Sequence, residues 1–149
     1  FKKVYAFELV GVHRQCFLKN MSALSINNFE LFPFGLGDKT IKSFVGNDKW
    51  AMDKFGYAAF NAKVVENKNG NENVTTLDSF NLKNISFIKI DVEGYELKLL
   101  KGAFNTIEKN KPLIFIEKKT NYDDLKNFLY GLNYDIIEEF EKDILFKAK

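Results

Sequence analysis

The feature that most constrains the fold is a nearly continuous apolar run over residues 85–92, which is accompanied by acids at its end. Such a run is typical of a parallel β-strand that is covered on both faces. Asp91, Glu93 and Glu96 lie within six residues, and Gly94 between them permits a sharp turn. The segment therefore predicts a buried strand with carboxylates at its carboxyl end and a helix immediately after it.

Strand-like and helix-like patterns alternate along the chain. Apolar runs predict strands at 4–7, 29–34, 41–45, 63–65, 74–77, 113–116, 134–137 and 144–146, and helical spacing predicts helices across 17–24, 97–107 and 125–132. This order indicates an α/β fold with a mostly parallel open sheet, right-handed crossovers and an antiparallel C-terminal edge. We expect one partial domain over residues 1–149, with a hairpin and loop excursion over 39–75.

Composition and charge exclude several classes of protein. The 149 residues are 46% hydrophobic and 28% charged, and the net charge of +2 is too small to imply a nucleic-acid or anionic-membrane partner. Arg14 is the sole arginine, so the basic surface consists mostly of lysines. Cys16 is the sole cysteine, which excludes an internal disulfide and a cysteine-based zinc site. We therefore expect a cytoplasmic protein with no bound metal and, because no apolar run approaches about 20 residues, no membrane span.

Ligands of open parallel sheets bind beyond the carboxyl ends of the strands. One such position is Glu8, whose carboxylate can accept hydrogen bonds from both hydroxyls of a ribose, or can be an ordinary exposed acid before a turn. Another is the segment 35–38, where Gly35 and Gly37 permit a tight turn and a close approach to a flat ring, or form a simple hairpin turn.

The acids after the central strand form the sharpest group. Asp91 and Glu93 point to the same side if the strand continues through Val92, and one of them can then serve as a general base. Asp91 is the stronger candidate, because an acid that is buried at a strand end needs a partner to offset its desolvation. Carboxylates in this arrangement can also bind a cation.

Other acids and the single histidine leave alternatives open. Glu96 can interact with the helix dipole, and Lys89 or Lys98 can neutralise the acids nearby. Glu117 ends the next predicted strand, so it and Asp91 can frame a substrate hydroxyl. His13 is more typical of a surface or capping position, although it lies only five residues after Glu8.

Four segments resemble the FkbM family of methyltransferases in the same order: 4–8 (Val-Tyr-Ala-Phe-Glu), 32–38 (Phe-Pro-Phe-Gly-Leu-Gly-Asp), 74–79 (Val-Thr-Thr-Leu-Asp-Ser) and 88–97 (Ile-Lys-Ile-Asp-Val-Glu-Gly-Tyr-Glu-Leu), which runs on to 100–103; residues 112–117 also fit. The resemblance implies a Rossmann-like class I methyltransferase fold and S-adenosylmethionine as the cofactor. It also implies methylation of a hydroxyl group on a saccharide, a glycolipid or a small metabolite.

The resemblance also implies roles for single residues. Glu8 would bind the cofactor ribose, and Phe34, Gly35 and Leu36 would flank the adenine. Asp91 would lie beside the reacting methyl group and the acceptor hydroxyl, and we expect Glu93 and Glu117 to complete the catalytic set.

Two departures from the family pattern stand out. Leu9 occupies the position at which the family usually has proline, which affects the turn after Glu8. The family's first strand and glycine-rich cofactor loop would precede Glu8, whereas this chain begins at Phe1 inside a predicted strand. We therefore expect an N-terminally truncated piece with an incomplete sheet that is inactive by itself.

Two other functions compete with methyl transfer. A binding or remnant domain of the same fold would lack turnover, and a dinucleotide-dependent oxidoreductase would also use a strand-end acid, although residues 91–94 (Asp-Val-Glu-Gly) argue against it. Selectivity for the acceptor is expected within residues 46–73. The aromatic residues there, Trp50, Phe55, Tyr57 and Phe60, can cover a substrate or pack locally.

Overall fold

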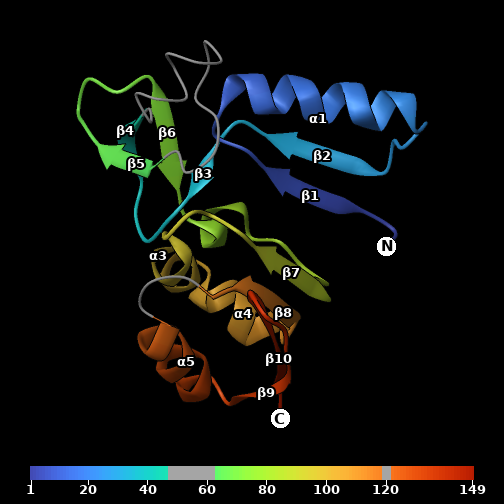
Figure 1. Ribbon diagram of the computed structural model, residues 1–149, viewed down its shortest axis with the longest axis vertical. Coiled ribbons are helices and arrows are strands. Elements are labelled where there is room, and N and C mark those ends of the chain that lie inside the picture. Colours follow the sequence, from blue (N-terminus) through green and yellow to red (C-terminus); the bar gives the residue numbers. More distant parts are fainter. Residues whose placement is uncertain (47–62, 119–121) are drawn as a thin grey trace. The chain divides into compact units, whose positions relative to one another are not determined.

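The computed structural model describes residues 1–46, 63–118 and 122–149 (Figure 1). These residues form two compact units, and each is described by itself. Unit 1 contains residues 1–36 and 40–75, and unit 2 contains residues 37–39 and 76–149.

Unit 1 begins with a strand, a helix and a second strand: β1 (Val4–Phe7), α1 (Gly11–Ala23) and β2 (Phe29–Phe32). The two strands are parallel, with Val4 opposite Phe29, and α1 runs alongside them (Figure 1). Phe17 of α1 meets Phe29 edge to face, at 5.1 Å between ring centroids. The predicted strand–helix–strand pattern is confirmed here, except that Leu24 is 66% exposed and caps the helix instead of packing in a core.

The second sheet of unit 1 has the strand order β3–β6–β4–β5. Its members are β3 (Gly35–Leu36), β4 (Ile41–Gly46), β5 (Lys63–Glu66) and β6 (Glu72–Thr75). β3 is parallel to β6, whereas β4 is antiparallel to both β5 and β6. A Cβ atom at Gly70 would lie 2.1 Å from the backbone oxygen of Ser43, so only glycine allows the loop after β5 to approach β4 this closely.

Unit 2 consists of a four-stranded sheet with helices. Its elements are η1 (Leu77–Phe80), β7 (Phe87–Ile90), α3 (Glu96–Gly102), α4 (Phe104–Asn110), β8 (Leu113–Glu117), α5 (Tyr122–Gly131), β9 (Tyr134–Glu139) and β10 (Asp143–Ala148). The strand order is β7–β8–β10–β9. β7 and β8 are parallel, while β10 is antiparallel to both β8 and β9, so the predicted antiparallel C-terminal edge is present.

The core of unit 2 is densely packed with aliphatic side chains. Ile90, Ile114, Ile116 and Ile144 of the sheet are no more than 1% exposed, and Tyr134 is fully buried with its hydroxyl donating to the Pro112 carbonyl oxygen at 2.9 Å. Burial raises the pKa of Tyr134 to about 12. The helices α3 and α5 pack against each other, and α5 also packs against β9.

The single helix predicted across 97–107 is divided into α3 and α4 at Ala103. At this point a Cβ atom on Gly102 would lie 1.8 Å from the Gly37 carbonyl oxygen, so the end of α3 is pressed against the backbone of residues 37–38. Ala103 is itself completely buried. The apolar spacing of the sequence continues smoothly through this site, and for that reason it does not reveal the break.

The mixed α/β class is confirmed. β7 is shorter than the predicted strand and has only β8 as a paired neighbour within the described ranges; its Phe87 is 36% exposed. The apolar run therefore does not mark a strand covered on both faces in this structure. The prediction that all the strands belong to one open, mostly parallel sheet remains a prediction.

Candidate functional site

The carboxyl end of β1 presents Glu8. The Glu8 backbone N–H donates to the Phe32 carbonyl oxygen at 3.1 Å, which extends the β1–β2 ladder by one residue. The Glu8 side chain is 34% exposed, and its Oε1 accepts a hydrogen bond from the Val10 N–H at 2.7 Å. Within the part of the chain that the structure describes, no group donates to its Oε2. One carboxylate oxygen is therefore tied to the turn, and the other accepts no hydrogen bond from the described residues.

The turn after Glu8 lies against the predicted ring-binding segment. Leu9 is 7% exposed, and a Cβ atom on Gly35 would lie 3.3 Å from the Leu9 Cδ2 and equally close to the Val74 Cγ2. Gly35 and Leu36 form the short strand β3, so the prediction of a turn at Gly35 is wrong. The absence of a side chain at Gly35 serves close packing. Through Leu9, unit 1 brings Glu8 and residues 34–36 together.

Two basic side chains from the first turns of α1 surround Glu8. The Arg14 Nη1 donates to the carbonyl oxygens of Glu8 at 3.0 Å and of Leu9 at 2.5 Å. The His13 Nδ1 lies 3.7 Å from the Glu8 Oε1. Sequence reasoning did not select Arg14. The available signal was its position six residues after Glu8, because a helix that starts at Gly11 turns its first side chains back toward the preceding strand.

In unit 2, two candidate acids lie at the ends of neighbouring strands. Ile90 pairs in register with Ile116, so Asp91 and Glu117 follow them at the same edge of the β7–β8 pair. Parallel strands are about 4.8 Å apart. The backbone thus places these two acids next to each other, as expected from the sequence.

Asp91 is not buried. Its side chain is 48% exposed, and its Oδ2 accepts from the Lys89 Nζ at 3.1 Å. The expectation that Asp91 is buried at the strand end is therefore wrong, since its side chain is about half exposed and pairs with Lys89.

The chain turns directly after Asp91. β7 ends at Ile90, so the predicted continuation through Val92 is wrong, and strand alternation does not set the direction of Glu93. Glu93 and Gly94 have φ values of 51° and 93°, and the Tyr95 N–H donates to the Val92 carbonyl oxygen at 3.2 Å. Two successive positive φ values with this hydrogen bond are the signature of a type I′ turn.

Glu96 belongs to the structure of this second turn. It is the first residue of α3 and is 2% exposed, and its Oε1 accepts from the Gly94 N–H at 3.0 Å. The alternative that Glu96 stabilises the turn and the helix start is supported.

Asp78, from the Thr-Leu-Asp segment, caps α4. Its Oδ1 accepts from the N–H and the Oγ1 of Thr106, both at 2.7 Å, and its Oδ2 accepts from the N–H at 3.0 Å and the Nδ2 at 2.9 Å of Asn105. Two of these four hydrogen bonds satisfy backbone N–H groups that the start of a helix leaves open, and the other two come from the side chains of the same residues. Asp78 therefore has a structural role within unit 2.

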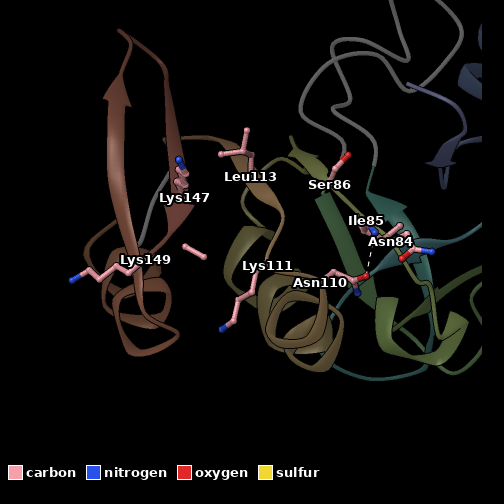
Figure 2. Close-up of a pocket in the computed structure, with 9 residues that line it drawn as sticks. Asn84, Ile85, Ser86, Asn110, Lys111, Leu113, Lys147 and Lys149 are labelled. Carbon is pink, nitrogen blue, oxygen red and sulfur yellow. Dashed lines mark hydrogen bonds between the residues drawn. The ribbon is translucent and has the colours of Figure 1, made fainter.

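A pocket of about 540 Å³ lies at the opposite edge of the unit 2 sheet (Figure 2). It adjoins the beginnings of β7 and β8 and the end of β10, whereas Asp91 follows the end of β7 and Glu117 is the last residue of β8. The lining residues are Asn84, Ile85, Ser86, Asn110, Lys111, Leu113, Lys147, Ala148 and Lys149. The Asn110 Oδ1 accepts from the Ile85 N–H at 3.1 Å, which fixes one wall (Figure 2). This pocket is separate from the strand-end acids.

Some predictions concern residues outside the described ranges. The aromatic candidates Trp50, Phe55, Tyr57 and Phe60 lie there. Among the residues that the structure does describe, no three His, Cys, Asp or Glu side chains are grouped so as to hold a metal ion. In the same ranges, no helix combines the length and the apolar character that a membrane crossing requires.

Comparisons with known proteins agree with the motifs. In its fold the chain is similar to the crystal structure of methyltransferase FkbM from Methylobacillus flagellatus KT, with a TM-score of 0.68 and 20% sequence identity. The similarity covers 99% of this chain and 37% of that one, so the chain spans little more than a third of its length. No curated protein matches the sequence. A family model of the methyltransferase FkbM domain matches residues 2–142, and the chain therefore belongs to this methyltransferase family.

Proposed function

We propose that the protein transfers a methyl group from S-adenosylmethionine to a hydroxyl group of a saccharide, a glycolipid or a small metabolite. The observation that carries the proposal is the match of residues 2–142 to the methyltransferase FkbM domain. We also infer a Rossmann-like class I arrangement, which is supported by the parallel pairs β1–β2 and β7–β8 and by the antiparallel edge formed by β10 and β9.

The residues around Glu8 fit the adenosine part of the cofactor. A carboxylate accepts hydrogen bonds and does not donate them, which suits the two hydroxyl donors of a ribose. The Glu8 Oε2, which accepts no hydrogen bond from the described residues, offers such an acceptor, and Oε1 retains a second lone pair beside its bond from Val10. We assign the ribose to Glu8 and the edge of the adenine to Phe34, Gly35 and Leu36, since Leu9 links these residues to the same turn.

The proposed chemistry needs alignment and a proton acceptor. When bound, S-adenosylmethionine supplies a methyl group that its sulfonium already activates. The chain must then hold the acceptor oxygen in line with that methyl carbon. We assign Asp91 as the general base that would take the proton of the acceptor hydroxyl as its oxygen bonds the methyl carbon and the bond from that carbon to sulfur breaks, with S-adenosylhomocysteine as the leaving product. Its exposed carboxylate supports this role, and its partner Lys89 restrains its orientation.

Glu117 and Glu93 receive supporting roles. Glu117 is the last residue of β8, and it and Asp91 directly follow the paired residues Ile116 and Ile90, which supports a role in orienting the acceptor hydroxyl. Glu93 adds a carboxylate on the turn that directly follows Asp91.

Calorimetric titration with S-adenosylhomocysteine tests the cofactor assignment in the protein at its full natural length. We expect binding by the native protein and a roughly 10- to 100-fold loss of affinity in Glu8→Ala, because charge-assisted hydrogen bonds are lost. Glu30→Gln is the matched control, since Glu30 is another half-exposed acid of unit 1 and is paired with Lys3 at 2.7 Å.

Transfer of labelled methyl groups from S-adenosylmethionine to a panel of saccharides, glycolipids and small alcohols tests the reaction. Failure of the native protein to bind either form of the cofactor would overturn the proposal. Binding without transfer to any hydroxyl acceptor would instead favour a non-catalytic domain of the same fold.

A further inference from the structure

We propose that Arg14 is a positioning residue for cofactor binding, because it fixes the turn from which the Glu8 carboxylate meets the ribose hydroxyls. The inference rests on the proposed function and adds a residue that the family motifs do not include. Arg14 acts in this account through Glu8 and does not touch the cofactor.

The contacts of Arg14 hold both peptide groups of the turn. Its Nη1 donates to the carbonyl oxygens of Glu8 and Leu9, at 3.0 Å and 2.5 Å. Its backbone N–H donates to the Val10 carbonyl oxygen at 3.1 Å. A Cβ atom on Gly11 would lie 3.6 Å from the Arg14 Nη2, so the guanidinium folds back over the start of α1. The Arg14 side chain therefore connects Glu8 and Leu9 to the helix, and its backbone N–H adds Val10.

The orientation of these peptide groups decides where the Glu8 carboxylate lies. The Val10 N–H can donate to the Glu8 Oε1, at 2.7 Å, only while the peptide group that joins Leu9 to Val10 faces the carboxylate. Arg14 holds the other end of this same peptide group, the Leu9 carbonyl oxygen. Without the guanidinium, both carbonyl groups can turn toward water, and the carboxylate loses its anchor.

The placement of the positive charges indicates that Arg14 positions the Glu8 carboxylate and does not neutralise it. Arg14 places its donors on two backbone carbonyls, and the basic group nearest the Glu8 carboxylate is His13, with 3.7 Å between Nδ1 and Oε1. No donor among the described residues forms a hydrogen bond to the Glu8 Oε2. Arg14 thus orients the acid without occupying the oxygen that a ribose hydroxyl needs.

The test is a double-mutant cycle with two ligands in the protein at its full natural length. Affinities are measured for S-adenosylhomocysteine and for its analogue that lacks both ribose hydroxyls, in the native protein, Arg14→Met, Glu8→Gln and the double variant. We expect Arg14→Met to weaken S-adenosylhomocysteine binding about tenfold and to change analogue binding by less than about twofold. In the Glu8→Gln protein, Arg14→Met has no further effect, because the group that Arg14 orients has already lost its charge.

Two further variants complete the design. Arg14→Lys retains one donor and restores about a third of the native affinity on the same scale. Lys19→Met removes a positive charge from the exposed part of α1 and leaves both affinities unchanged. Circular dichroism establishes that each variant is folded, and if Arg14→Met is not, the comparison of the two ligands is made with Arg14→Lys.

An equal loss of affinity for both ligands would overturn the inference, since a general structural role would affect them alike. An unchanged affinity in Arg14→Met, with a loss in Glu8→Gln, would also overturn it while leaving the proposed function intact. A native protein that binds neither ligand would remove the proposed function and this inference together.

Discussion

The two strand-to-helix turns that carry the candidate acids are held in different ways. The turn from β1 to α1 is fixed by side chains: the Glu8 carboxylate binds the Val10 N–H, and the Arg14 guanidinium binds two carbonyl oxygens. The turn from β7 to α3 is fixed by a strained backbone, with positive φ at Glu93 and Gly94, and by the buried Glu96 carboxylate that accepts from the Gly94 N–H. In the first turn the candidate acid is part of the scaffold, whereas in the second turn Asp91 lies beside the scaffold.

This difference determines which substitutions separate function from stability. A change at Glu8 removes the acceptor of the Val10 N–H as well as a proposed ligand, so its effects on binding and folding are mixed. Asp91 has a half-exposed ion pair with Lys89, and such pairs contribute about 0–1 kcal/mol to the free energy of unfolding. Asp91 in the second turn therefore offers the cleaner test of catalysis. Substitutions at Glu96 and Gly94 test which groups stabilise that turn.

The largest effect is expected for Asp91→Asn. Loss of the proposed general base should reduce the proposed methyl transfer by about 10²- to 10⁴-fold, while the free energy of unfolding should change by less than about 1 kcal/mol. Steady-state kinetics and urea denaturation measure the two quantities. Asp135→Asn is the matched control, because Asp135 is 55% exposed and also pairs with a lysine at 3.1 Å, the distance found for Asp91. A comparable loss of rate in this control would remove the special role of Asp91.

The next largest effect is expected for Glu96→Ala. The substitution leaves the Gly94 N–H without its acceptor and opens a space at a site that is 2% exposed, so we expect a loss of about 1–3 kcal/mol in the free energy of unfolding. Glu96→Gln keeps an oxygen in place and should recover most of this loss. If both variants are as stable as the native protein, Glu96 does not support the turn.

A smaller loss is expected for Gly94→Ala. A Cβ atom at φ 93° is strained, and we expect a cost of about 1–2 kcal/mol. The control is Gly131→Ala at the end of α5, where no neighbouring atom lies within 4 Å of the added Cβ. Thermal unfolding of the two variants compares the sites, and equal stability would mean that the second turn does not depend on a glycine.

The positions of most strands and helices can be predicted from the sequence, because burial of one face produces a local apolar pattern with the period of that element. The strands at 4–7 and 113–117 and the hairpin of β9 and β10 agree with their apolar runs. The neighbourhood of Asp91 and Glu117 could also be predicted, because the strand-end rule needs only the order of the strands. Where an apolar pattern comes from a single strand or a single helix face, the sequence is enough to predict the position of that element.

The remaining features depend on contacts between distant residues. The break at Ala103 arises where Gly102 meets Gly37, and the cap of α4 comes from Asp78, more than twenty residues earlier in the chain. The exposure of Asp91 depends on where β7 stops, and its apolar run gives no signal of that end. Arg14 was missed for another reason: its contacts are local, but a hydrogen bond to a carbonyl oxygen has no sequence motif, and only its position six residues after Glu8 was a signal.

The smallest effect concerns Glu93 and tests whether the backbone of the second turn stores strain. A non-glycine residue at φ 51° is disfavoured, so Glu93→Gly should raise the free energy of unfolding by up to about 1 kcal/mol. Glu93→Asn, which tolerates the same conformation, should be stabilised to a similar degree. Because both variants also remove a proposed catalytic carboxylate, methyl transfer should fall, but by less than in Asp91→Asn. Denaturation and kinetics on the same samples separate the two effects. A loss of stability in both variants would show that the Glu93 side chain, and not the turn conformation, holds this end of β7.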